Sequence, residues 1–237
     1  MVSPKFKLTY FNVRGRGEVI RLALTVAGFE FEDDRLTEEA FAARKYDMPF
    51  NQLPVLEITE NDGQVKRLAQ QHAILRYIGR IGGLYPEDPF VAAKVDEVLG
   101  ACEDVSLIMK PNMSEPDAEK RVNMREEMIK PEGELTVFLR KFDAVVAASG
   151  TEAYTVGDKL TIADLMLYVQ ASWLSVGVLR GIPKTYYEQF TYLNKVKENV
   201  DKLPDVAKWN KHAAELGAKL HAAALAAKAA AQATATA

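Results

Sequence analysis

The residues best suited to chemistry lie near the N-terminus, in the stretch KFKLTYFNVRGRGEVIRLAL at residues 5–24. A strand-like alternation of apolar side chains ends at Tyr10, and Arg14 and Arg16 follow. The apolar spacing after Glu18 predicts a helix whose first free amides face the same place. A phenol donor, a guanidinium and a helix N-terminus each stabilise a negative charge. The pattern therefore favours an anion site, and the alternative is a tyrosine that only packs at a strand end.

Other reactive side chains are weaker candidates. The three histidines, His72, His212 and His221, are far apart in the sequence, and their spacing matches no zinc motif, so we expect no metal requirement. Cys102 is the single cysteine of the chain and lies on the apolar stripe of a predicted helix. A thiol in that position behaves as a small buried hydrophobe rather than as a nucleophile. Tyr10 therefore remains the strongest candidate.

Composition indicates an ordinary globular protein. The chain has 237 residues, of which 48% are hydrophobic and 27% charged, with a net charge of −3. This length suits one large domain or two small ones, and the small negative charge argues against nucleic-acid binding. The single cysteine fits a reducing compartment, and no signal-peptide pattern or membrane-spanning apolar run is evident. We therefore expect a cytoplasmic protein that binds neither nucleic acid nor membrane.

The first eighty residues predict a short α/β domain. The order of elements is strand, helix, strand, helix, strand, strand, helix, which indicates a sheet with one hairpin edge. The turn Asn61-Asp62-Gly63 joins the last two strands. The predicted strands cover residues 5–10, 29–32, 55–58 and 65–68, and the predicted helices run from 18 to a stop at Gly28, from 37 to 46 and from 71 to 81.

After Pro89 the sequence predicts helices alone. Thr161 to Asp164 reads as a capping box that opens a very apolar, central helix. The alanine-rich tail from about residue 217 has little apolar bulk, so we expect a frayed helix that runs into disorder. The predicted helices cover 90–110, 117–148 with a break near Pro131 and Gly133, a segment from 161, 186–202 and a segment from 205.

Three stretches together resemble the cytosolic glutathione transferases, most closely the sigma class, which includes the haematopoietic prostaglandin D synthases. The likeness covers about residues 5–212. It implies a thioredoxin-like glutathione-binding domain at residues 1–83, an all-helical domain at 84–237, and a homodimer. The stretches are LTYFNVRGRGEVIRLAL at 8–24, MPFNQLPVLEI with AQQHAILRYIG at 48–58 and 69–79, and YTVGDKLTIADL at 154–165.

The resemblance implies that Tyr10 is the catalytic phenol, assisted by Arg16, and that glutathione is the co-substrate. A thiol with a pKa near 8.5 is only a few per cent ionised at neutral pH, and the thiolate is the nucleophile. Lowering that pKa by about 2 takes about 2.7 kcal/mol. One hydrogen bond to a charged acceptor supplies roughly 1.5–3 kcal/mol. A phenol donor is therefore sufficient to hold a thiolate that belongs to the substrate.

The resemblance also implies a set of glutathione contacts. Pro54 matches a cis-proline that leaves the backbone of Leu53 free to pair with the cysteinyl unit. Three positions depart from the family pattern: Phe41 replaces tryptophan, Gln52 replaces lysine, and Gln71 replaces serine. We therefore expect weaker glutathione affinity than in a sequence with the usual donors. The implied set is Tyr10, Phe11, Arg16, Phe41, Lys45, Gln52, Leu53, Pro54, Gln70, Gln71 and, across the dimer, Asp104 of the partner subunit.

For the second substrate we expect an apolar pocket, although Met109, Met166 and Trp173 could equally belong to the core. The candidates are Val13, Arg14, Met109 and Met166, with Trp173 as a further one. The implied reaction is the addition of glutathione to small electrophiles. Two alternatives stay open: a glutathione-dependent prostaglandin-type isomerase, and a non-catalytic ligand-binding or structural relative. Tyr10 argues against the non-catalytic alternative, whereas Phe41 and Gln71 favour it.

Overall fold

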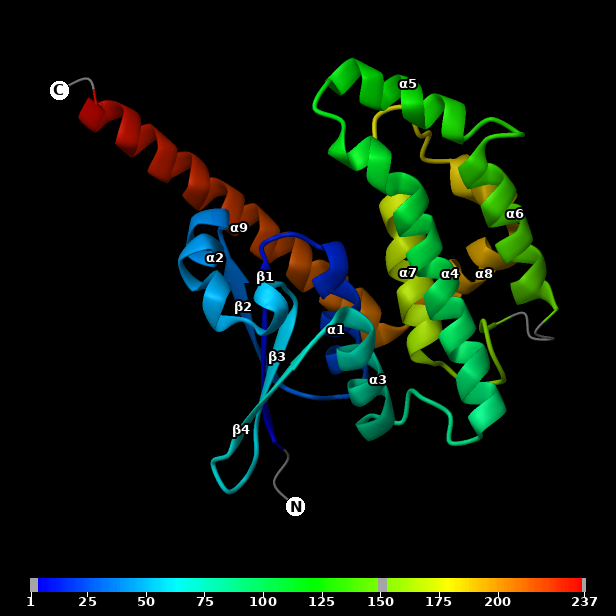
Figure 1. Ribbon diagram of the computed structural model, residues 1–237, viewed down its shortest axis with the longest axis horizontal. Helices are drawn as coiled ribbons and strands as arrows, with labels where there is room; N and C mark the ends of the chain where they lie inside the picture. The colour runs from blue at the N-terminus through cyan, green and yellow to red at the C-terminus, as the bar shows by residue number, and fades with distance from the viewer. Residues whose placement is uncertain (1–3, 149–152, 236–237) are drawn as a thin grey trace.

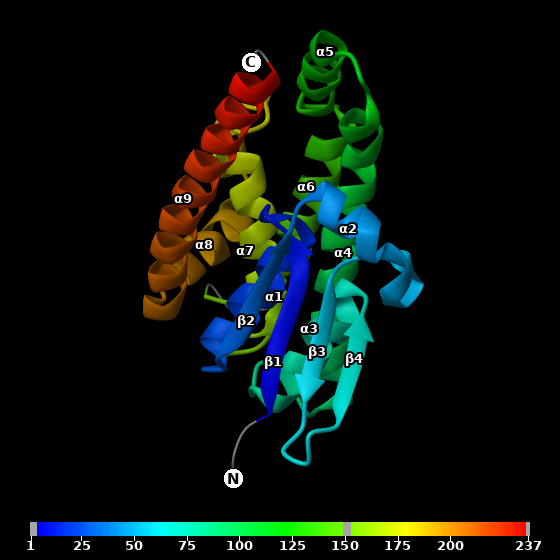
Figure 2. The same cartoon turned by 90° about the vertical axis from the view of Figure 1, so that its left-hand side faces the viewer.

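The computed structural model describes residues 4–148 and 153–235, and for residues 220–235 it describes the backbone alone. A sheet with its flanking helices makes up the N-terminal part, and a group of helices makes up the rest (Figure 1). Helices α1 and α3 lie between the sheet and the C-terminal helices (Figures 1 and 2). This arrangement is the thioredoxin-like domain followed by the all-helical domain that the sequence predicts.

The four-stranded sheet has the order β2-β1-β3-β4. Strand β1 pairs parallel with β2 and antiparallel with β3, and β3 and β4 form the predicted hairpin. Alternation along β1 buries Phe6, Leu8 and Tyr10 on one face, as the period of a strand requires. The elements are β1 (Lys5–Phe11), α1 (Gly15–Val26), β2 (Phe31–Leu36), α2 (Glu38–Arg44), the short turns η1 (Lys45–Asp47) and η2 (Pro49–Asn51), β3 (Val55–Thr59), β4 (Val65–Ala69) and α3 (Gln71–Ile81).

Among the described residues of the C-terminal part, helices are the regular elements, and loops connect them. Helix α7 is central: it contacts α1 and α3 of the sheet domain as well as α4 and α8. The elements are α4 (Pro89–Ser114), α5 (Ala118–Met128), α6 (Glu134–Ala147), α7 (Ile162–Ser175), the short turn η3 (Tyr186–Gln189), α8 (Thr191–Asp201) and α9 (Pro204–Ala235).

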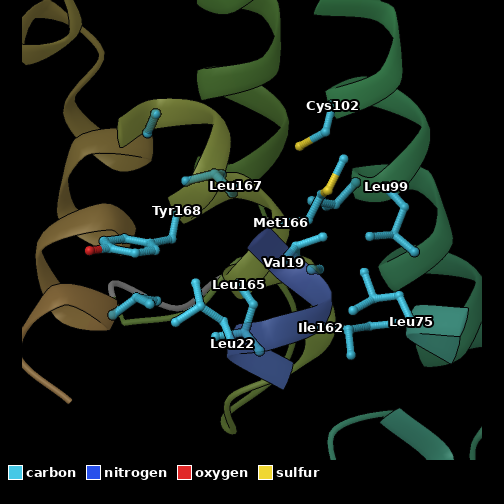
Figure 3. Packing of buried hydrophobic residues seen from close by; sticks show 14 of the residues in the cluster. Val19, Leu22, Leu75, Leu99, Cys102, Ile162, Leu165, Met166, Leu167 and Tyr168 are labelled. Atoms are coloured by element: carbon cyan, nitrogen blue, oxygen red, sulfur yellow. The ribbon is translucent and has the colours of Figure 1, made fainter. Parts of the chain in front are cut away.

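One apolar core joins the two parts (Figure 3). Val19 and Leu22 of α1 lie against Ile162 and Leu165 of α7, and Cys102 of α4 points into the same cluster. All five side chains are fully buried. The sheet domain is therefore packed against α7 by continuous apolar contact, and the site at the end of β1 lies where α1, α3, α4 and α7 meet.

The capping box at the start of α7 is confirmed. Asp164 is fully buried, and its carboxylate accepts hydrogen bonds from the backbone and the hydroxyl of both Thr155 and Thr161, at 2.6–3.0 Å. Burial is the largest influence on this carboxyl and raises its pKa, whereas the four donors act in the opposite direction. The box therefore fixes the loop before α7 as well as the first turn of the helix.

The structure differs from the predictions at several element boundaries. Strand β2 occupies Phe31–Leu36 rather than 29–32, because its pairing with β1 continues to the end of that strand. Helices α5 and α6 are separate elements rather than one broken helix. The segment 186–202 likewise divides into η3 and α8. Helix α9 continues through the alanine-rich tail to Ala235, as the high helix propensity of alanine allows.

Candidate functional site

Tyr10 lies at the end of β1 against the first turn of α1. Its side chain is 8% exposed, and its hydroxyl oxygen accepts a hydrogen bond of 3.0 Å from the backbone N–H of Arg16. A tyrosine hydroxyl both accepts and donates, so its proton stays available to an acceptor in the site. The amide also polarises the phenol and makes it a better donor. The expectation that a free helix amide faces the phenol is thus confirmed.

Two glycines allow this close approach. A Cβ added to Gly17 would lie 2.5 Å from Cδ1 of Tyr10, and one added to Gly15 would lie 2.7 Å from its hydroxyl oxygen. Gly15 also has a φ of +39°, a conformation that residues with a side chain rarely adopt. The pattern Arg-Gly-Arg-Gly after the strand therefore serves to place the phenol against the helix start.

Arg16 is held across the interface between the two domains. Its guanidinium donates two hydrogen bonds to the Glu103 carboxylate on α4, of 2.6 and 3.0 Å, and one of 3.2 Å to Oε1 of Gln71 at the start of α3. The hydrogen bonding to the Glu103 carboxylate is the main cause that raises the pKa of Arg16, so the guanidinium stays a cation. The cation beside Tyr10 therefore has a carboxylate partner, which sequence reasoning missed.

Three aromatic rings line the next part of the site. Tyr10 contacts Phe11 edge-on with 5.7 Å between ring centres, and Phe11 contacts Phe41 of α2 in the same way at 5.2 Å. Lys45 lies exposed in η1, directly after α2. The structure thus brings Phe11 and Phe41 together, with Lys45 just beyond the C-terminal end of α2.

A third group of predicted residues gathers between η2 and α3. The amide nitrogen of Gln70 donates to Oε1 of Gln52 at 3.3 Å, and both side chains are exposed. Gln70 has a φ of +70°, an uncommon conformation for a residue with a side chain, and such outliers often occur in binding sites. The Leu53–Pro54 peptide bond is cis, as predicted.

A cavity of about 530 Å³ opens beside Arg16 and continues between α1, α4 and α7. Arg14, Arg16 and Gln71 form its polar end, and the remainder of the wall is mainly apolar. Of the predicted second-substrate residues, Val13, Arg14, Met166 and Trp173 line this cavity. The full lining is Val13, Arg14, Gly15, Arg16, Gln71, Ser106, Met166, Val169, Gln170, Ser172, Trp173, Val176 and Val178.

Met109 was wrongly predicted to line this pocket. Its side chain is 0% exposed and belongs to the core cluster, one turn beyond Val105 on the buried stripe of α4. Ser106, three residues earlier, lines the cavity instead. Helix α4 has two adjacent stripes of side chains, of which one faces α6 and α7 and the other faces the site. Sequence periodicity alone does not separate these two stripes.

The thiol of Cys102 does not line the cavity. Cys102 is fully buried in the core, and burial raises the pKa of its thiol, as a structural role predicts. Within residues 4–148 and 153–235, no group of three or more histidine, cysteine or acidic side chains could hold a metal ion. In that same part of the chain, no helix is both long enough and apolar enough to cross a membrane.

The most informative residue that the sequence did not reveal is Glu103. Asp104, the residue singled out from the resemblance, is the next one on α4 and is exposed. Glu103 faces Arg16 instead. The one sign of Glu103 in the sequence was its position: it is an acidic residue next to the predicted Asp104, on a helix expected to flank the site.

Family models match two regions of the chain. The model described as "Glutathione S-transferase, N-terminal domain" matches residues 6–80, and that described as "Glutathione S-transferase, C-terminal domain" matches residues 103–213. Together they cover both structural parts described above.

Similar proteins carry related names. The chain is 38% identical over 213 residues to "Glutathione S-transferase 1" of Ascaris suum, covering 87% of this chain and 95% of the relative. It is 28% identical over 208 residues to "Hematopoietic prostaglandin D synthase" of Gallus gallus, with 87% and 95% covered. Among solved structures, "Fasciola hepatica sigma class GST" superposes with a TM-score of 0.76 at 26% identity, covering 88% of this chain and 96% of that one.

Proposed function

The chain belongs to the glutathione S-transferase family and is a glutathione transferase, and we propose that Tyr10 holds the glutathione thiolate for attack on an electrophile. The single observation that supports this role most directly is the bond from the Arg16 N–H to the Tyr10 hydroxyl. That bond occupies an acceptor position of the phenol and leaves its proton for the sulfur. The phenol then favours the ionised form of the thiol, which is the nucleophile.

Arg16 supplies a positive field next to the phenol in this proposal. Its charge is balanced by Glu103, so its effect on the thiolate is smaller than that of an unpaired cation. Tyr10 therefore carries most of the thiolate stabilisation, and Arg16 adds a lesser electrostatic contribution.

The rest of the glutathione molecule would lie along the predicted residues. We propose that Gln70 and Gln71 bind its γ-glutamyl end, that the backbone of Leu53 before Pro54 pairs with the cysteinyl unit, and that its glycine carboxylate lies near Lys45. Phe11, Phe41 and Gln52 complete this path. The substitutions Phe41 and Gln52 remove a donor and a charge relative to the family pattern, so we expect weak glutathione binding, which calorimetry measures directly.

The second substrate would enter the cavity beside Arg16. Its mostly apolar wall, which includes Met166 and Trp173 as well as Arg14, suits small hydrophobic electrophiles. We further propose a sigma-class homodimer in the cytoplasm that acts in detoxification, with a glutathione-binding domain at residues 1–83 and a helical domain at 84–237. In that dimer Asp104 of the partner subunit would reach the glutamyl amine.

A second candidate activity is isomerisation of a prostaglandin-type endoperoxide, suggested by the similarity to the Gallus gallus relative. The same thiolate would attack the peroxide and be released again. Product analysis separates the two activities, because conjugation retains glutathione in the product and isomerisation returns it.

The decisive test is a spectroscopic titration of bound glutathione that follows thiolate absorbance against pH in the wild type and in Tyr10→Phe. We expect the bound thiol of the wild type to ionise about 2 pH units below its solution pKa, and the substitution to remove most of that shift. A thiol that binds without any shift would instead favour the non-catalytic alternative.

A further inference from the structure

The beginning of α9 is hydrogen-bonded to the segment that follows Tyr10. The indole Nε1 of Trp209 donates to Oε1 of Glu18 at 3.0 Å, and Oδ1 of Asn210 accepts from Nη2 of Arg14 at 3.1 Å. Helix α9 contacts α1, and in Figure 2 it lies on the same side of the molecule as β2. The ring centre of Trp209 is 5.9 Å from that of Phe31 on β2. The C-terminal helix is thereby joined to the chain on both sides of Gly15.

Glu18 is the centre of these contacts. Its side chain is 1% exposed and accepts from Arg14 at 3.1 Å, from Arg21 at 3.3 Å and from Trp209 at 3.0 Å. A buried carboxylate is stable only when its oxygens are paired. Trp209 is the one donor in this set that comes from outside α1 and its N-cap residue. The position of the Glu18 carboxylate therefore depends on α9 as well as on its own helix.

Arg21 carries the connection to the backbone beside Tyr10. Its guanidinium is fully buried and donates to the carbonyl oxygens of Val13 at 2.8 Å and Phe11 at 3.2 Å. It also lies 5.7 Å from the centre of the Tyr10 ring. Arg21 pairs with two carboxylates, Asp33 at 2.9 Å and Glu18 at 3.3 Å, so Glu18 is one of the two groups that position the cation bound to the backbone of residues 11–13.

Asn210 provides a second, independent attachment. Its Nδ2 donates to the Tyr168 hydroxyl at 2.7 Å, and that hydroxyl donates to Asp201 at 2.6 Å. These bonds orient the amide so that its oxygen faces Arg14, which lines the cavity of the site. Tyr168 points away from α4, toward the side of α7 on which α8 and α9 lie (Figure 3).

We propose that Trp209 and Asn210 are positioning residues, which hold residues 11–16 in the geometry that the phenol and the cavity wall require. The effect on the bound thiol rests on the function proposed above for Tyr10. The effect on the segment itself does not, because every contact in the chain of bonds joins residues of this protein to one another. Two separate readouts therefore test the two parts.

The experiment compares the full-length wild type with Trp209→Phe, which keeps a ring against Phe31 but lacks the indole N–H, and with Asn210→Ala. Lys211→Ala, an exposed neighbour on the same helix, is the matched control. Hydrogen exchange in the ligand-free protein reports on the amides of residues 11–18, including the Arg16 N–H that bonds to Tyr10. The pH titration of bound glutathione reports on the thiol.

We expect exchange at residues 11–18 to become several-fold faster in both variants, and the pKa of the bound thiol to rise by about 0.5 or more. Lys211→Ala should match the wild type in both measurements. If the two variants fold and exchange at the wild-type rates, the inference is overturned. Faster exchange with an unchanged thiol pKa would also overturn it, because Trp209 and Asn210 would then have a merely structural role. If the wild-type thiol itself keeps its solution pKa, the proposed function fails, and exchange alone then decides whether α9 holds the segment.

Discussion

Glu103 on α4 binds Arg16 on α1 through two hydrogen bonds, of 2.6 and 3.0 Å, so an ion pair between the two domains lies beside the phenol of the site. The pair is partly exposed, with 29% of the Glu103 side chain and 48% of the Arg16 side chain accessible. It contributes little to stability for that reason. Its main consequence is electrostatic, because the carboxylate offsets the positive field that a bound thiolate would experience.

Replacing Glu103 by glutamine should therefore lower the pKa of bound glutathione. The amide keeps an acceptor for Arg16 but removes the negative charge, and we expect the thiol pKa to fall by a few tenths, less so in 1 M salt, where screening is strong. The titration of bound thiolate absorbance measures this shift. Glu97→Gln, on an exposed part of the same helix, is the control and should leave the pKa unchanged. A rise in Glu103→Gln would mean that the carboxylate acts by positioning Arg16.

Gly17→Ala should disable the site more than it destabilises the fold. The new Cβ would lie 2.5 Å from the ring of Tyr10, so the ring must move away from the Arg16 amide. We expect kcat/KM to fall at least tenfold, and overpacking to lower the free energy of unfolding by about 1–3 kcal/mol. Gly100→Ala on α4 meets no atom within 4 Å and should raise stability by roughly 0.5–1 kcal/mol without affecting activity. Equal activities in both variants would contradict the close-contact role of Gly17.

His72 should make stability depend on pH. Burial lowers the pKa of His72 below its ordinary value, and its Nε2 is buried without a hydrogen-bond partner in the described part of the chain. Glu103 and Asp96 oppose this lowering, and Arg16 and Arg76 reinforce it. The folded state therefore binds a proton less readily than the unfolded state.

The sign of the pH dependence follows from that difference. The contribution of His72 to stability is fully present above the unfolded pKa of about 6.5 and is lost as pH falls through the lower folded pKa. His72→Leu should flatten this part of the decline in urea unfolding free energy between about pH 7 and pH 5. The exposed His212 offers a control, and His212→Gln should keep the wild-type slope. An unchanged slope in His72→Leu would assign the decline to other groups.

Asp164→Ala should be strongly destabilising. Four donors from Thr155 and Thr161 would lose their acceptor at once, and we expect a loss of roughly 3–5 kcal/mol in the free energy of unfolding. Thr161→Ala removes one helix cap and should cost only about 1 kcal/mol. Denaturant unfolding of both variants measures the difference. Similar losses in the two would indicate that the cap alone, rather than the buried carboxylate, stabilises the start of α7.

Local pattern was sufficient for much of the architecture. The alternation of Phe6, Leu8 and Tyr10, the stop at Gly28 and the capping box at Thr161 each reflect interactions within a few residues, so the sequence alone determined the order of elements and the placement of the phenol at a strand end. Even the Gly15 and Gly17 pair could be read as a turn next to Tyr10. Element boundaries were less certain, because the extent of β2 depends on its pairing with β1.

Only the tertiary structure decided how the site is assembled from distant parts of the chain. Glu103 and Asp104 are neighbours in sequence, yet the orientation of α4 places only Glu103 against Arg16. Met109 and Ser106 lie on adjacent stripes of that helix, and packing against α6 and α7 buries the first and leaves the second in the cavity. Trp209 donates a hydrogen bond to Glu18, which lies 191 residues earlier in the sequence. Such contacts follow from the packing of α1, α4 and α9 against α7 and α8. Local sequence periodicity does not predict this packing.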